Sequence, residues 1–228
     1  MENGIKEAGH KPSREELGLP SYTIPEEILN AATHGLGALA AVAGLVWLLL
    51  NCRRDALTLV SISVFGGSMI LLYLVSTLYH GLGVCRGKRV LRILDHCTIF
   101  VLISGTYTPI ALLCFGGTTG WILFAIVWGV SAAGIALNAV SVQRFRVFSM
   151  ICYIGLGWLV IFFLKPLIAC LDGASIRNLV LGGIFYTVGA ILYGIGKKRK
   201  YIHSVWHLFV LAGSVFHYFV IYRIAVPS

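Results

Sequence analysis

Charged residues are scarce in this sequence. They make up 12% of its 228 positions, whereas hydrophobic residues make up 58%. A soluble domain of this length needs more charge than that to cover its surface. The mean hydropathy is correspondingly high, at +0.87. The composition therefore excludes a soluble globular protein and indicates an integral membrane protein without a sizeable soluble domain.

The N-terminal part lacks the features of a cleavable signal peptide. Its first thirty residues are polar and of mixed charge, without a basic n-region followed by an apolar h-region. Pro12, Pro20 and Pro25 discourage a long helix there. We expect a short, mobile cytoplasmic tail. The sequence then divides into this tail, 1–26, and one membrane domain, 27–228.

Long apolar stretches alternate with short polar breaks. Each stretch approaches the ~20 residues that a helix needs to cross ~30 Å of hydrocarbon. A turn cluster at 116–120 and a charged break at 144–146 separate neighbouring stretches. The stretches are continuously apolar rather than alternating, which does not suit a β-barrel. The sequence predicts an all-α bundle of seven transmembrane helices, at 33–50, 57–79, 93–115, 121–140, 147–169, 179–195 and 204–224.

Lysines and arginines gather in alternate breaks between the predicted spans. One side carries the tail (with Lys6, Lys11 and Arg14), 86–92, 144–146 and 197–200. The opposite side carries only Arg53, Arg54, Lys165, Arg177 and Arg223. The positive-inside bias therefore predicts a cytoplasmic N-terminus and a C-terminus outside. The basic runs are explained as topology determinants and contacts with anionic lipids, so we expect no nucleic-acid partner.

The six cysteines form no CxxC pair and no zinc-ribbon spacing. Cys52, Cys114 and Cys170 lie near the outer ends of predicted spans, where a disulfide can form. We favour the simpler interpretation that the cysteines are small apolar residues of helices.

Polar side chains within the predicted spans are few, and such residues mark functional sites in membrane proteins. The predicted topology brings a small set of them to one depth on the cytoplasmic side: Ser76, His80, Asp95, His203 and His207. His203 and His207 are one helical turn apart, which suits two nitrogen ligands at ~2.0–2.1 Å from a zinc ion. His80 supplies a third nitrogen. Three protein ligands with an open fourth position are typical of catalytic zinc.

Asp95 and Ser76 can hydrogen-bond a water molecule at that open position or orient a ligand. The alternative is a polar network that joins the helices without a metal, in which each bond contributes only ~0.6 kcal/mol. Three histidines and an aspartate are a costly choice for that role, so we favour the metal site.

Other polar residues have two interpretations or a structural one. Glu27, Asn30 and His34 share a helix face, and they either cap the first span and tie it to its neighbours or line the site. His217 lies ~15 Å deeper than the histidine pair, too far for the same metal, so we expect a buried, hydrogen-bonded histidine. We interpret His96 as structural.

Taken in order, five motifs resemble the hemolysin III family, the bacterial branch of the progestin and adipoQ receptors, which are similar in turn to alkaline ceramidases. The motifs are EILNAATHGLG at 27–37, STLYH at 76–80, LDH at 94–96, SGTYTP at 104–109, and HSVWH at 203–207 with His217. The resemblance implies a seven-helix protein of the bacterial plasma membrane with a cytoplasmic N-terminus.

The resemblance also implies zinc held by His80, His203 and His207, and it matches Asp95 and Ser76 to the family's aspartate and serine. Because the tail here is short, adiponectin-type ligand recognition is not implied.

Together these features predict a zinc-dependent hydrolase that cleaves an amide or ester bond of a membrane lipid, or a regulator of membrane lipid homeostasis. Zinc lowers the pKa of a bound water from about 15.7 to ~7. Asp95 would take or relay the proton, and Ser76 would help to hold the oxyanion. An apolar cavity between the helices would suit an acyl chain. Two alternatives stay open: a non-enzymatic membrane sensor with structural zinc, and a membrane-lysing protein. Seven spans without an export signal argue against a secreted toxin.

Overall fold

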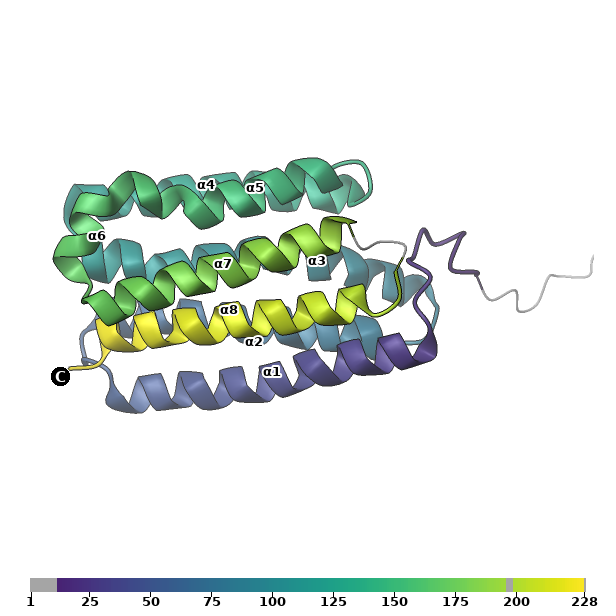
Figure 1. Ribbon diagram of the computed structural model, residues 1–228, viewed down its shortest axis with the longest axis horizontal. Helices are drawn as coiled ribbons and strands as arrows, with labels where there is room; N and C mark the ends of the chain where they lie inside the picture. The colour runs from purple at the N-terminus through teal and green to yellow at the C-terminus, as the bar shows by residue number, and fades with distance from the viewer. Residues whose placement is uncertain (1–11, 196–198, 228) are drawn as a thin grey trace, which may run out of the picture.

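The computed structural model describes residues 12–195 and 199–227. Within these ranges every regular element is a helix, and seven helical segments are long and apolar enough to cross a membrane (Figure 1). This confirms the predicted fold class. Lys6, Lys11, Lys197 and Lys198, which contributed to the predicted orientation, lie outside the described residues.

The helices follow the predicted order, and two of the spans are composite. The elements are α1 (Ile24–Asn51), α2 (Ala56–Gly81), α3 (Arg86–Pro109) with a π-helical continuation η1 (Ile110–Phe115), α4 (Gly117–Ser141), α5 (Arg146–Trp158), a 3₁₀ turn η2 (Leu159–Phe163), α6 (Leu164–Cys170), α7 (Gly173–Ile195) and α8 (Ile202–Ala225). The third span consists of α3 and η1, and the fifth of α5, η2 and α6.

The first helix begins at Ile24, well before the predicted start at residue 33. Thr23 caps its first turn through a capping box: the Thr23 hydroxyl accepts from the Glu26 N–H at 3.4 Å, and the Glu26 carboxylate accepts from the Thr23 N–H at 2.9 Å. Pro25 lies in that first turn, where its missing N–H costs nothing. A window of hydropathy does not register this polar turn, so the helix extends further than the apolar stretch.

The part of the tail that precedes α1 is packed onto the bundle instead of being mobile. Leu17 and Leu19 are buried in a small cluster with Tyr79 of α2. Between the two leucines, Gly18 has a φ of 62°, the left-handed conformation that glycine adopts most readily. Its carbonyl accepts a hydrogen bond from Arg92 of α3 at 2.7 Å. The segment 12–23 therefore lies across one end of the helices.

Helix α2 has α1, α3 and α8 as neighbours. At Gly105 of α3, an added Cβ would collide with Ser68 and approach the Val64 carbonyl, so glycine permits the close approach of α2 and α3 there. The start of α1, the end of α2, and the starts of α3 and α8 lie at one end of the bundle, next to the packed tail (Figure 1). That this end is cytoplasmic remains a prediction from the charge distribution.

A disulfide joins Cys114 in η1 to Cys170 at the end of α6, with Cα atoms 5.6 Å apart. It lies at the end of the bundle opposite the tail. Our interpretation of the cysteines as unbridged apolar residues is wrong for this pair, because the fold brings together two helix ends that are 56 residues apart in sequence. Cys52, the third candidate, is free and buried.

The disulfide predicts a thiol count. Unfolded protein that has not been reduced should react with maleimide at the four free cysteines, Cys52, Cys85, Cys97 and Cys152. After reduction all six should react. Intact-mass spectrometry measures both counts. In a Cys114→Ser variant, Cys170 should join the reactive thiols without any reductant. Six reactive thiols in unreduced wild-type protein would contradict the pairing.

Candidate metal centre

Three imidazoles from two helices meet at the end of the bundle that the packed N-terminal segment covers. His80 lies near the end of α2, and His203 and His207 lie in the first two turns of α8. Nε2 of His203 is 3.2 Å from Nε2 of His80 and 3.1 Å from Nε2 of His207. Nitrogens at 2.0–2.1 Å from a tetrahedral metal are separated by about 3.3–3.4 Å. The three side chains, the only such group within the described ranges, can therefore hold one metal ion.

The hydrogen bonds of the outer ring nitrogens test this fit. Nδ1 of His80 lies 2.7 Å from a Glu27 carboxylate oxygen, and Nδ1 of His207 lies 3.3 Å from the Thr33 hydroxyl. The Thr33 hydroxyl already donates to backbone carbonyls of its own helix, so it accepts from His207. Both rings then carry their proton on Nδ1 and direct an Nε2 lone pair at His203. One hydrogen on Nε2 of His203 cannot satisfy two lone pairs, whereas a metal ion satisfies all three nitrogens.

Asp95 and Ser76 lie at the same end of the bundle but outside the three-histidine group. Asp95 of α3 is 4% exposed and lies on the wall of a cavity that His203 also lines. Its carboxylate is 3.8 Å from Nδ1 of His96. The Ser76 hydroxyl, one turn before His80, is buried and has no hydrogen-bond partner among the described residues. The roles assigned to both residues stay predictions.

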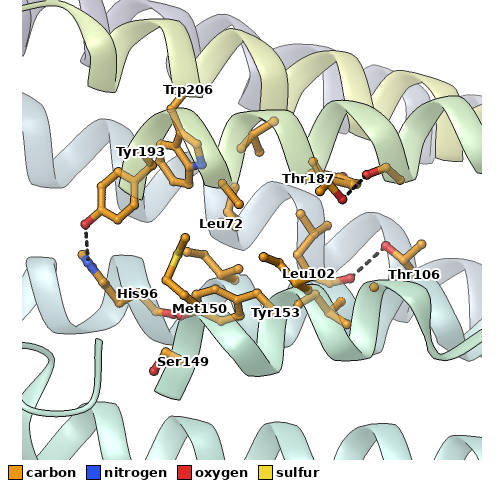
Figure 2. Close-up of a pocket in the computed structure, with 18 of the residues that line it drawn as sticks. Leu72, His96, Leu102, Thr106, Ser149, Met150, Tyr153, Thr187, Tyr193 and Trp206 are labelled. Atoms are coloured by element: carbon orange, nitrogen blue, oxygen red, sulfur yellow. Dashed lines mark hydrogen bonds between the residues drawn. The ribbon is translucent and has the colours of Figure 1, made fainter. Parts of the chain in front are cut away.

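A cavity of about 130 Å³ extends from His203 into the bundle between α3, α5, α7 and α8. Asp95 and His203 line one end, and His217 lines the other. At 1.5 Å per residue, His203 and His217 are roughly 21 Å apart along α8. Figure 2 shows His96 and Tyr193 joined across one end of the cavity; the separation between ring nitrogen and hydroxyl is 3.5 Å. Most of the remaining wall is aliphatic or aromatic.

The shared face of Glu27, Asn30 and His34 lines the site, and the helix cap is formed by other residues. Asn30 is fully buried; its amide oxygen accepts from the Ser204 hydroxyl, and its amide nitrogen is 3.5 Å from Nδ1 of His80. The His34 ring stacks on the His207 ring at 3.6 Å between centroids. The three- and four-residue spacing thus indicated the correct face: these side chains contact the candidate metal ligands, and by the same contacts they tie α1 to α2 and α8.

The two other histidines of the spans behave as structural groups. Nε2 of His217 is 3.2 Å from the Leu179 carbonyl, which agrees with the predicted hydrogen-bonded histidine. Nδ1 of His96 is 3.0 Å from the Arg92 carbonyl in the preceding turn. Both rings also contribute to the cavity wall, which the sequence did not indicate.

Lys88 belongs to a basic run that we interpreted as a topology determinant and a contact with anionic lipids, but it is only 1% exposed. Its ammonium donates to the carbonyls of Tyr79 and Leu82, at 2.8 Å each, where α2 ends. It also lies 3.0 Å from a carboxylate oxygen of Glu27. A lysine in a basic run has no sequence signal that distinguishes it from its exposed neighbours.

Tyr22 was also missed, because it belongs to the segment expected to be mobile. Its ring stacks on the His203 ring, with centroids 4.9 Å apart and an interplanar angle of 19°. Desolvation in this position raises the pKa of the Tyr22 hydroxyl well above its ordinary value, so the group stays neutral. The packed tail therefore covers the histidine group directly.

Comparison with known proteins agrees with the family resemblance that the sequence motifs indicated. Residues 22–218 match the family model described as Haemolysin-III related. The chain is 45% identical over 210 residues to the Hemolysin-3 homolog of Bacillus subtilis (strain 168), which covers 90% of this chain and 98% of the relative. It is 41% identical over 216 residues to Hemolysin-3 of Bacillus cereus, covering 94% and 98%. It is 24% identical over 209 residues to the human Monocyte to macrophage differentiation factor, covering 88% and 85%.

Proposed function

The chain belongs to the haemolysin-III-related family of multi-pass membrane proteins, and we propose that it is a zinc-dependent hydrolase that cleaves an amide or ester bond of a membrane lipid. The observation that supports this most directly is the convergence of three Nε2 atoms beside an apolar cavity that also presents a carboxylate. Zinc held by His80, His203 and His207 would lower the pKa of a water molecule to ~7 and so supply a nucleophile at neutral pH.

Two side chains at this end of the bundle are candidates for the remaining steps. Asp95 is buried at the metal end of the cavity, where its carboxylate can take a proton from water and pass it to the leaving group. The Ser76 hydroxyl has no partner among the described residues, so it is free to donate to an oxygen of the substrate. Tyr22 covers the histidines from the tail side and limits the access of bulk water.

The cavity supports a lipid as the substrate. Its apolar wall extends over roughly 20 Å, most of the ~30 Å thickness of the hydrocarbon layer, which suits an acyl chain. Asp95 and Arg146 make the end near the metal ligands polar. A polar end and an apolar body fit an amphiphile whose scissile bond lies close to its head.

The printed name of the Bacillus cereus relative, Hemolysin-3, favours a second candidate function, lysis of membranes. A pore or a detergent-like action would release vesicle contents without breaking a covalent bond. A third candidate, a sensor with structural zinc, would do neither.

One experiment separates the three candidates. Purified protein is reconstituted into neutral vesicles that contain ceramide and ester lipids and enclose a fluorescent dye, with zinc supplied or chelated. We expect fatty acid to be released only with zinc, and the dye to stay enclosed. Dye release without fatty acid would replace hydrolysis by lysis. No release of either, from zinc-loaded and folded protein, would overturn the hydrolase and leave the sensor.

A further inference from the structure

Glu27 connects three helices at the metal centre. It is 7% exposed and lies one turn into α1. One carboxylate oxygen is 2.7 Å from Nδ1 of His80. The other oxygen is 3.0 Å from the Lys88 ammonium of α3 and 3.0 Å from the Arg14 guanidinium of the tail. The two oxygens therefore have different partners, since one contacts a candidate metal ligand and the other contacts two cations.

The contact with His80 selects one form of that ring. A carboxylate can only accept hydrogen bonds, so the proton of His80 is on Nδ1. In the neutral ring Nε2 then keeps its lone pair, and this is the nitrogen that faces His203. A carboxylate on the outer nitrogen also makes a histidine ligand more basic and fixes the orientation of its ring.

The two cations hold the Glu27 carboxylate in the position that its contact with His80 needs. Lys88 is anchored by the carbonyls at the end of α2, the same helix that carries His80. Arg14 is anchored by the Pro20 carbonyl at 2.9 Å. With two anchored cations on one oxygen, the carboxylate is fixed in place, and its second oxygen is directed at His80.

We infer that Glu27 is the positioning residue of the metal centre: it holds His80 with Nε2 toward the ion and increases the affinity of the site for zinc. Thr33 provides a weaker version of the same contact for His207, through a hydroxyl at 3.3 Å from Nδ1. The inference rests on the zinc binding proposed above. The competing explanation is that Glu27 only balances the buried charge of Lys88.

The zinc affinity of Glu27→Gln protein distinguishes the two explanations. Glutamine keeps the size of the side chain but lacks the negative charge. We expect zinc to bind roughly 10–100-fold more weakly than in the wild type, the usual loss when such an outer carboxylate is removed. Competition with a chromophoric chelator measures the affinity of purified, detergent-solubilised protein. The thermal midpoint of metal-free protein is recorded alongside, because a merely structural ion pair would lower that midpoint without changing the affinity.

Glu26→Gln is the matched control. Glu26 is the neighbouring buried glutamate, and its carboxylate accepts from the backbone N–H groups of Thr23 and Tyr201 rather than from a histidine ring. It should bind zinc as the wild type does. If Glu27→Gln protein fails to fold, Glu27→Gln/Lys88→Met protein is measured instead. This double variant removes the buried positive charge at position 88 together with the negative charge at position 27, so no unpaired charge is left. The same loss of zinc affinity is expected.

The outcomes separate this inference from the proposed function. Wild-type affinity in the folded Glu27 variants would overturn the positioning role while zinc binding stands. Wild-type protein that binds no zinc would overturn both. An equal loss in the Glu26→Gln control would mean that any change at the start of α1 disturbs the site, and it would also overturn a specific role for Glu27.

Discussion

Replacing His203 and His207 together by alanine should reduce bound zinc from about one ion per chain to almost none, because a lone imidazole does not make a site. Only His80 would remain of the three converging nitrogens. Elemental analysis of purified protein, divided by the protein concentration, measures the content. His217→Ala is the control. His217 lies in the same helix but at the far end of the cavity, so its loss should leave the zinc content unchanged.

The opposite outcome is equally clear. Wild-type protein without zinc, and a double variant that is just as stable, would mean that the histidines serve packing. Our proposal would then shift to a lipid-responsive structural protein. The separations of 3.2 and 3.1 Å from Nε2 of His203 to Nε2 of His80 and of His207 would need another explanation, since the Nδ1 partners of His80 and His207 leave no hydrogen to place between all of them.

The second large effect concerns Asp95. Asp95→Asn should lower lipid turnover by about 10²–10⁴-fold, the usual contribution of a general acid–base group, while zinc content stays near that of the wild type. Asparagine has the same shape but cannot take a proton. Fatty-acid release from vesicles at saturating lipid measures the rate, and elemental analysis of the same sample measures the metal.

Asp172→Asn is the control for this substitution. Asp172 lies between α6 and α7, at the opposite end of the bundle, where it pairs with Arg223 at 3.0 Å. The backbone N–H of Ser175, above all, holds the pKa of its carboxyl below the ordinary value. Its loss should not affect turnover. Unchanged turnover in Asp95→Asn would refute the assigned mechanism, whereas a parallel loss of zinc would make Asp95 part of the metal site.

The sequence predicts the spans and the convergence of the histidines for a simple physical reason. A helix must be continuously apolar to cross the bilayer, so the seven segments are visible in composition alone. Alternation of direction then brings the end of one span beside the start of the next. His80, near the end of α2, and His203, near the start of α8, were placed at one level by this rule, and the structure joins them at 3.2 Å.

Features that depend on the reach of individual side chains could not be predicted in this way. Lys88 is buried because three carbonyls at the end of α2 and the Glu27 carboxylate surround its ammonium, and this environment exists only after folding. Residues 12–23 pack against the bundle because Leu17 and Leu19 contact Tyr79, which is distant from them in sequence. The pairing of Cys114 with Cys170 likewise depends on where η1 and α6 end.

The ribosome synthesises the three candidate metal ligands at different times. His80 precedes His203 by 123 residues, which takes about 6 to 25 s at roughly 5–20 residues per second. Glu27, His80 and Lys88 all belong to the first three helices, so their contacts can form while α8 is still being made. The contacts that hold His80 can thus form before His203 and His207 have been synthesised. If the protein binds zinc as proposed, the ion would complete the site only after α8 has been made, when the first helices are already in place.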